Sequence, residues 1–221
     1  MKKYLIVIPA RSGSSFRGKN TYPCAGLPLI YHTVNAAQNL GHDVLISTDD
    51  HYIKAEAEQF GTMIDDRPEH LCTAEATLDS VMWHIHKQYR DYENFICLPP
   101  TSPLRTQSHV KAAITLFEKL EAESLVSVKR ELKSIWKHYG SYAQPIVERL
   151  KNRQLVEPVF IANGAIFITA SHILTQFKRR LAGKTALYEM DEPSSVDIHT
   201  EADIELAEHY LHQLDKGNYK I

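Results

Sequence analysis

The chain has 221 residues, 43% of them hydrophobic and 24% charged, which is enough to bury the core of one domain. Its 25 basic and 27 acidic residues give a net charge of −2, without the basic excess typical of nucleic-acid binders. The three separated cysteines, Cys24, Cys72 and Cys97, match neither a disulfide framework nor a zinc site. We therefore expect a small-molecule partner, no nucleic-acid partner and a reducing, cytoplasmic location.

The sequence begins with a short apolar run, YLIVI at 4–8, which ends before Pro9 and Arg11. A run of this length is too short for a signal peptide or a membrane-spanning helix, so no membrane partner is expected. It is better interpreted as the buried first strand of a sheet.

After this strand, amphipathic stretches alternate with apolar runs along most of the chain. The predicted strands lie at 4–8, 43–48, 62–64, 94–100, 124–128, 165–169 and 186–190. The predicted helices lie at 28–40, 51–61, 77–90, 109–122, 171–183 and 201–214. The alternation indicates an α/β fold with a mostly parallel, Rossmann-like sheet and helices on both faces.

Between about residues 129 and 160 the alternation fails, and the sequence becomes aromatic and basic without a clear period. No internal repeat, low-complexity tract or separate linker stands out elsewhere. We interpret 129–160 as an excursion from a single domain that spans 1–221.

The loop PARSGSSFRGKN, at 9–20, follows the first strand and combines small residues with three cations, Arg11, Arg17 and Lys19. Open parallel sheets bind ligands beyond the carboxyl ends of their strands, where such a loop suits a polyphosphate. A basic, solvated turn without a ligand is the simpler alternative.

The same loop almost matches the phosphate-binding pattern GxxxxGK[ST], through Gly13, Gly18 and Lys19. Asn20 stands where that pattern needs a hydroxyl for magnesium, and the prolines at 23 and 28 prevent an immediate uninterrupted helix. These differences favour a triphosphate loop of another kind.

The chain resembles the acylneuraminate cytidylyltransferases, the CMP-sialic acid synthetase family. The resemblance begins with IPARSGSSFRGKN and AGLPLIYHTV, and it continues nearly to the end of the chain. The later matching motifs are VLISTDD at 44–50, RPEHL at 67–71, DSV at 79–81, LPPTSPLR at 98–105, NGAIFIT at 163–169 and VDIHTEADIELAE at 196–208.

The resemblance implies a nucleotidyltransferase that moves CMP from CTP to the anomeric hydroxyl of a nonulosonic acid and releases pyrophosphate. It also implies Mg²⁺, or Mn²⁺ in its place, and a homodimer formed through the excursion. The implied nucleotide contacts are Arg11, Ser14, Lys19, Asn20, Arg67 and Ser80. Ser80 could instead be an ordinary helix-start residue.

On the sugar side the resemblance points to Thr101, Ser102 and Arg105, with Gln154, Asn163 and Gly164 further along the chain. Arg105 could equally make a structural pair, and the Asn-Gly pair could be a simple turn. Many relatives carry Gln at one of the two prolines before Thr101, and Asp where this chain has Ala74. These departures leave the sugar contacts open.

For catalysis we predict Lys19, Arg11 and Asp197, because cations can screen the phosphates and a carboxylate suits Mg²⁺. Asp197 is the predicted metal ligand. Many relatives carry a second Asp two positions later, where this chain has His199, a residue poorly matched to Mg²⁺. His199 would orient a water, contact phosphate or cap the helix that begins near Thr200, where the spacing to Asp203 fits a capping box.

Two alternatives stay open at this point. A cytidylyltransferase for another sugar acid, such as 3-deoxy-manno-octulosonate, would keep the same nucleotide loop. A noncatalytic nucleotide-binding protein would be expected to lack the combination of Lys19 and Asp197. The sequence does not distinguish sialic, legionaminic and pseudaminic acids as acceptors.

Overall fold

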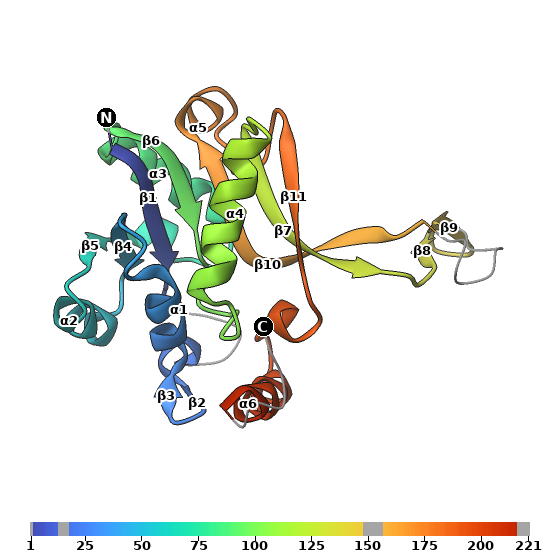
Figure 1. Cartoon of the computed structure of the whole chain (residues 1–221), viewed down its shortest axis with the longest axis horizontal. Helices are drawn as coiled ribbons and strands as arrows, with labels where there is room; N and C mark the ends of the chain where they lie inside the picture. The colour runs from blue at the N-terminus through green and yellow to red at the C-terminus, as the bar shows by residue number, and fades with distance from the viewer. Residues whose placement is uncertain (1, 13–17, 148–156, 216–221) are drawn as a thin grey trace.

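The computed structural model describes residues 2–12, 18–147 and 157–215. At its centre lies a seven-stranded sheet in the order β11-β7-β10-β6-β1-β4-β5 (Figure 1). These strands are β1 Lys2–Pro9, β4 Asp43–Thr48, β5 Met63–Asp66, β6 Tyr92–Cys97, β7 Ser124–Glu131, β10 Val159–Ala170 and β11 Thr185–Met190. Only β10 runs antiparallel to its neighbours within this sheet, so the predicted, mostly parallel α/β sheet is confirmed.

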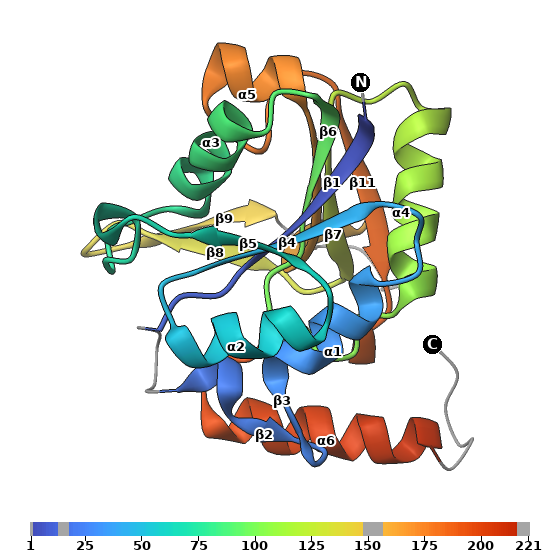
Figure 2. The ribbon, with the colours of Figure 1, turned by 90° about the vertical axis from the view of Figure 1, so that its left-hand side faces the viewer.

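The helices are α1 Leu29–Ala37, α2 His51–Gln59, α3 Leu78–Gln88, α4 Gln107–Lys119, α5 Ser171–Phe177 and α6 Glu201–Asp215. Helices α3 and α5 lie on one side of the sheet and α4 on the other, while α6 runs below it beside the hairpin β2–β3 (Figure 2). That hairpin consists of β2 Pro23–Cys24 and β3 Leu27–Pro28. No helix in the described ranges is long and apolar enough to cross a membrane.

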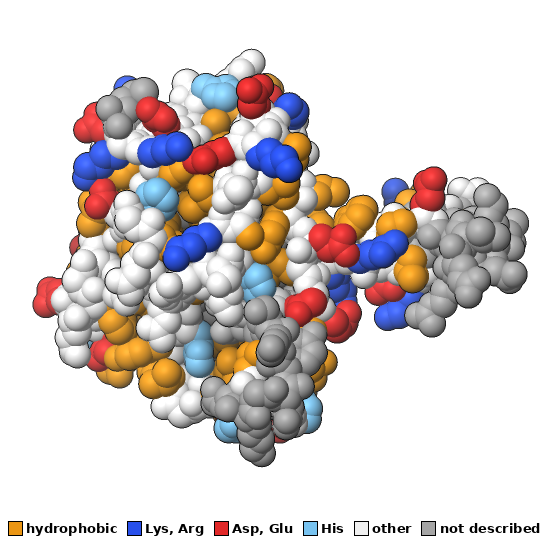
Figure 3. All heavy atoms as spheres, viewed as in Figure 1, with side chains coloured by type: hydrophobic (Ala, Val, Ile, Leu, Met, Phe, Trp, Pro, Cys, Tyr) orange, Lys and Arg blue, Asp and Glu red, His pale blue; other side chains and the backbone are white. Residues whose placement is uncertain are grey.

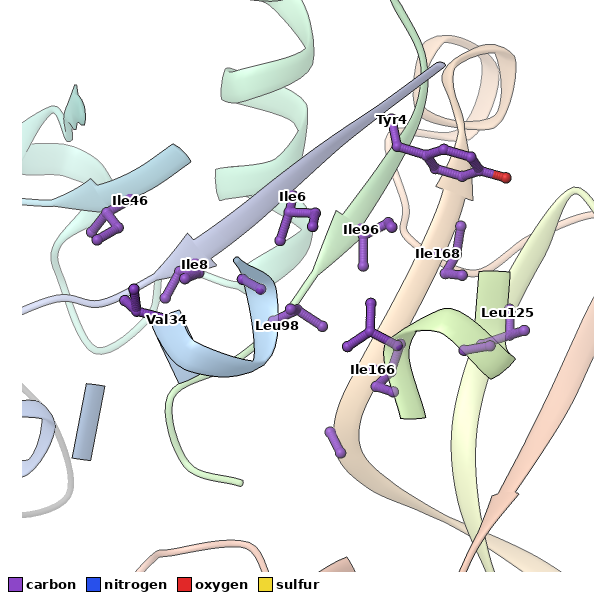
Figure 4. Close-up of a cluster of buried hydrophobic side chains, with 14 of the residues drawn as sticks. Tyr4, Ile6, Ile8, Val34, Ile46, Ile96, Leu98, Leu125, Ile166 and Ile168 are labelled. Carbon is purple, nitrogen blue, oxygen red and sulfur yellow. The ribbon is translucent and has the colours of Figure 1, made fainter. Parts of the chain in front are cut away.

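Alternating residues of β1 fill two separate cores. Tyr4, Ile6 and Ile8 join a cluster with residues of α1, α2 and α4 (Figure 4). Leu5 and Val7 point to the other face, into a cluster with residues of α3 and α5. This burial on both faces explains why the strand reads as one continuous apolar run rather than as an alternation.

The predicted helix at 171–183 is too long. Helix α5 ends at Phe177, because Lys178 adopts a left-handed conformation with φ of 52° and its N–H bonds to the carbonyl of Leu174. The residues that follow therefore form a loop, and Arg180 in this loop lies against the ring of Phe167 in β10.

Between β7 and β10 the chain forms an arm that projects from the body (Figure 1). We use this name for residues 129–147 and 157–162. The arm contains the ends of β7 and β10 and a hairpin of β8 Ile135–His138 and β9 Ala143–Val147. The predicted strand at 165–169 is thus only the inner half of β10, since its outer half pairs with β7 in the arm. Residues 159–162, which were predicted in part to belong to the segment without a clear period, are therefore part of a regular strand.

Candidate active site

A pocket of about 350 Å³ lies where β1 and β6 end, as expected for a sheet of this kind. Its walls come from six separate parts of the chain. The described residues that line it are Pro9, Arg11, Lys19, Asn20, Leu78, Pro99, Pro100, Thr101, Gly164, Phe167, Arg180, Asp197 and His199. The structure therefore brings together Arg11, Lys19, Asn20, Thr101, Gly164 and Asp197 from the predicted set.

Lys19 is the most buried cation of the pocket, with 8% of its surface exposed. Its Nζ donates to the carbonyl of Ile198 at 3.1 Å. Burial lowers the pKa of Lys19, and the negative charge of Asp197 acts in the opposite direction. The ammonium is thus held in one place with little water around it, where its charge would act strongly on an anion bound in the pocket.

Arg11 and Asn20 fix the ends of the first loop. Arg11 donates through Nη1 to the carbonyls of Thr73 at 2.7 Å and Cys72 at 3.2 Å, and Asn20 Nδ2 donates to the carbonyl of Arg11 at 2.9 Å. Asp49 accepts from the backbone N–H of Ser12 at 2.8 Å. Ser14 lies outside the described residues.

Asp49, which binds the first loop through Ser12, was not predicted from the sequence, although it belongs to the motif VLISTDD. It follows β4, the strand beside β1, so its carboxylate lies at the same edge as the first loop. Burial opposes ionisation of Asp49, but the hydrogen bonds from Ser12, the backbone N–H of Asp49 and the charge of Arg67 together outweigh it and lower the pKa of the carboxyl group.

Asp197 turns one oxygen toward His199, whose Nε2 lies 2.9 Å from Oδ2. Its Oδ1 is buried and has no hydrogen-bond partner among the described residues. Gly164 has φ of +75°, and a Cβ there would lie 3.2 Å from Asp197 Oδ2. The glycine thus gives the carboxylate room that a larger residue would reduce.

The capping box predicted at the start of α6 is present. Asp203 Oδ2 accepts from the backbone N–H of Thr200 at 2.8 Å, while Thr200 Oγ1 accepts from the N–H of Asp203 at 3.4 Å. The backbone N–H of His199 also donates to Asp203, at 2.9 Å. Helix capping therefore fixes the backbone beside Asp197 and leaves the His199 ring free to contact the carboxylate.

Two predicted nucleotide contacts, Arg67 and Ser80, are not among the residues that line the pocket. Arg67 is 5% exposed and donates through Nη2 to the carbonyl of Ser47 at 2.6 Å, which also accepts from the N–H of Ala10. Burial lowers the pKa of Arg67. Ser80 Oγ donates to the carbonyl of Thr77 at 2.7 Å, as a helix-start residue does. In this structure Arg67 supports the base of the first loop.

Arg105 also lies outside the pocket, with 2% of its surface exposed. It donates through Nη1 to the carbonyls of Ala165 at 2.7 Å and Pro99 at 3.1 Å, and through Nη2 to Thr33 Oγ1 at 2.7 Å. Of the two roles predicted for Arg105, a sugar contact or a structural contact, these hydrogen bonds favour the structural one. Arg105 fixes the proline turn against β10, because its guanidinium satisfies carbonyls from both.

Ser102 and Asn163 are likewise buried, at 1% and 6% exposure. The hydroxyl of Ser102 has no partner among the described residues. Asn163 accepts from Ser127 Oγ at 2.6 Å and donates to Ser195 Oγ at 2.9 Å, so it ties three segments together behind the pocket. Gln154 lies outside the described residues.

The sequence reasoning also missed Arg180, a third cation in the pocket wall. Its Nε donates to Asp79 Oδ1 at 2.6 Å, and its guanidinium carbon lies 4.3 Å from the centre of the Phe167 ring. No pattern near RRL singles this residue out. The helix expected over 171–183 would have included it, whereas the observed helix α5 ends at Phe177.

Comparison with known proteins gives the family of the chain. A family model described as cytidylyltransferase matches residues 5–213. The chain belongs to the cytidylyltransferase family. Within it, an N-acylneuraminate cytidylyltransferase from Escherichia coli O18:K1:H7 is 34% identical over 93% of this chain and 51% of its own length. The chain spans about half the length of this relative and of a similar one from Streptococcus agalactiae.

A shorter member of the cytidylyltransferases, the CMP-N,N'-diacetyllegionaminic acid synthase of Legionella pneumophila, is 30% identical over 93% of this chain and 95% of its own length. The solved structure of a CMP:2-keto-3-deoxy-manno-octonic acid synthetase complexed with CTP gives a TM-score of 0.70 at 17% identity. It covers 96% of this chain and 99% of the other. This likeness supports the fold.

Proposed function

We propose that the protein transfers CMP from CTP to the anomeric hydroxyl of a nonulosonic acid of the sialic, legionaminic or pseudaminic type. One observation carries the proposal: Lys19 from the first loop and Asp197 from near the end of the chain line the same pocket at the carboxyl edge of the sheet. The names of the relatives at 30% identity or more supply the substrate class.

The reaction forms a bond from the anomeric oxygen to the α-phosphorus and breaks the bond from that phosphorus to the bridging oxygen. Pyrophosphate leaves with the electron pair of that bond, and the hydroxyl loses its proton. Negative charge therefore builds on the phosphate oxygens, where the Lys19 ammonium can stabilise it. Arg11 is the second cation of this wall.

The side chains present fit a magnesium ion bound through few protein ligands. The described residues contain no group of three or more His, Cys, Asp or Glu that could hold a metal. Asp197 would hold the ion through its unpartnered Oδ1, and Mg²⁺ usually completes its shell with water and substrate phosphate. When bound, such an ion supplies charge stabilisation to the phosphates, and Mn²⁺ would serve in its place.

The same proposal includes a homodimer formed through the arm and a cytoplasmic location. The arm exposes large apolar side chains, among them Trp136 at 59% and Ile146 at 64%. Figure 3 shows hydrophobic side chains beside charged ones on the part of the arm nearest the body. Apolar side chains gathered outside the body are typical of an interaction surface.

Pyrophosphate release tests the proposal directly. The enzyme is assayed with CTP, ATP, GTP and UTP, each against sialic, legionaminic and pseudaminic acids and 3-deoxy-manno-octulosonate. We expect turnover with CTP and one of the three nonulosonic acids. Turnover with octulosonate alone would establish the alternative acceptor, comparable turnover with ATP would contradict the nucleotide assignment, and CTP binding without any turnover would indicate a noncatalytic protein.

A further inference from the structure

Arg180 occupies the pocket wall in a fixed orientation. Both its backbone N–H and its Nε donate to Asp79 Oδ1, at 3.2 and 2.6 Å. The ring of Phe167 lies against the guanidinium, with 4.3 Å between the guanidinium carbon and the ring centre. A side chain held on two sides is already ordered before any ligand binds, so it loses little entropy on binding.

One end of this guanidinium is left without a partner. Arg180 Nη1 is buried and makes no hydrogen bond within the described part of the chain. A buried donor that lacks an acceptor is costly, and arginine has five donor hydrogens to satisfy. An oxygen of a bound ligand would remove this cost.

The position of Arg180 separates it from the phosphate-binding cations. Lys19 and Arg11 follow β1, whereas the ring under Arg180 belongs to β10, and β6 lies between these two strands. The nearby lining residues Leu78 and Phe167 are apolar. This part of the pocket therefore suits a second, less charged substrate beside the triphosphate.

Asp79 determines which oxygen is suitable. Its carboxylate already neutralises the guanidinium, and a second carboxylate at Arg180 would lie close to it and be repelled. A hydroxyl or carbonyl oxygen accepts the same hydrogen bond without that repulsion.

From these observations we propose that Arg180 determines acceptor specificity by donating to a neutral oxygen of the sugar acid, either a hydroxyl or an N-acyl carbonyl. The inference rests on the proposed function, since it assigns the acceptor side of the same pocket. Asp79 is a positioning residue, because it acts only by holding the guanidinium.

The test compares Arg180→Met, Arg180→Lys and Asp79→Asn with the wild type, using the acceptor that the wild type turns over best. Arg179→Met is the matched control, because Arg179 is the neighbouring arginine and is exposed. We expect Arg180→Met to lower kcat/KM for the acceptor about 10- to 100-fold, while the Kd for CTP changes less than twofold. Arg180→Lys and Asp79→Asn should raise the acceptor KM by smaller factors, and Arg179→Met should match the wild type.

A second acceptor, with a hydroxyl in place of the N-acyl group, locates the oxygen. If the penalty of Arg180→Met disappears with this acceptor, the carbonyl is the partner, and if it persists, a hydroxyl is. Both results support the inference. An unchanged acceptor kcat/KM in Arg180→Met overturns it and leaves the proposed function standing.

Direct binding keeps the two proposals distinguishable. Saturation-transfer NMR measures the binding of the sugar acid to wild type and variants in the presence of a nonhydrolysable CTP analogue. Acceptor binding that is lost in Arg180→Met, without pyrophosphate release from the wild type, would overturn the proposed function alone. No acceptor binding to the wild type would overturn both. If Arg180→Met fails to fold by circular dichroism, Arg180→Lys decides by the same criteria.

Discussion

Lys19 is buried although it carries a charge, and its replacement separates catalysis from packing. Lys19→Met keeps the aliphatic stem that fills the wall and removes the ammonium. We expect pyrophosphate release at saturating CTP to fall at least about 100-fold, since in the proposed reaction the ammonium lies where charge develops in the transition state. The loss of the bond to the carbonyl of Ile198 should cost only about 1–2 kcal/mol of stability.

Rates at saturating CTP and urea unfolding check this prediction. Arg17→Met, in the same loop, serves as a comparison for a general loss of positive charge. An unchanged maximal rate in Lys19→Met would remove Lys19 from the chemistry.

Asp197 and His199 form a second residue-scale test. If Asp197 Oδ1 holds the metal, Asp197→Asn should lose most activity, because the amide keeps the shape but not the charge. His199→Asp should retain activity and reach half-maximal rate at several-fold lower Mg²⁺, because it adds an oxygen ligand. Near-normal activity of Asp197→Asn at every Mg²⁺ concentration would contradict the assignment.

Single residues were predictable from the sequence only where a motif fixed both type and place. The pocket contains Lys19, Asn20 and Asp197, as predicted. Each of them follows or precedes a strand or helix that could be predicted from the alternation of apolar and amphipathic stretches. Arg105 did not, since nothing in LPPTSPLR shows that carbonyls of Pro99 and Ala165 face it. Arg180 escaped notice because the helix expected over 171–183 would have enclosed it.

Among the elements, α4 begins with a capping box that is sensitive to pH. Thr106 Oγ1 accepts from the N–H of His109 at 3.3 Å, and the N–H of Thr106 donates to His109 Nδ1 at 3.2 Å. That second bond requires Nδ1 without a proton. Burial lowers the pKa of His109 below its ordinary value near 6.5, with Arg105 acting in the same direction and Asp191 against it.

Because the folded state keeps His109 neutral, its contribution to stability is complete above pH 6.5. It is lost as the pH falls below 6.5, where the unfolded chain binds the proton first. The unfolding free energy of the wild type should fall between pH 7.5 and pH 5.0. We expect this fall to be smaller by about 0.5–1 kcal/mol in His109→Gln, since glutamine also completes a capping box but does not bind a proton.

Urea unfolding at both pH values measures this difference. His51→Gln, at an exposed position of α2, is the matched control. Equal pH dependence in His109→Gln and the wild type would show that the capping bond does not carry the effect.

The types of most elements followed from the sequence, but the direction of β10 did not. A strand buried on both faces has the same apolar run in either direction, so AIFIT at 165–169 could not reveal that it runs antiparallel to β6 and β7. The direction is set by the arm, through which the chain returns beside β7. The pairing of Val159–Ala162 with the end of β7 shows that return in the structure.

For the whole molecule, the arm should decide the oligomeric state. Within the described residues, strands β8 and β9 pair only with each other, so their side chains contribute little to the packing of the body. We expect Trp136→Glu combined with Ile146→Glu to convert a dimer into a monomer in sedimentation velocity, because charges would be buried in the interface. The melting temperature of the monomeric body should change little.

Leu206→Glu is the control for this experiment, since Leu206 is an apolar side chain on α6, outside the arm, and 45% of its surface is exposed. It should leave the sedimentation coefficient unchanged. A wild type that sediments as a monomer at every concentration would contradict the dimer.

The hydrogen bond between Lys19 and Ile198 spans 179 positions of the chain. During synthesis on the ribosome, Lys19 emerges early, and all seven strands of the central sheet are complete by Met190. Ile198, Asp197 and His199 leave the exit tunnel only later. A nascent chain can therefore assemble its whole sheet while one wall of the pocket is still missing, so the pocket is complete only after residues 197–199 have left the ribosome.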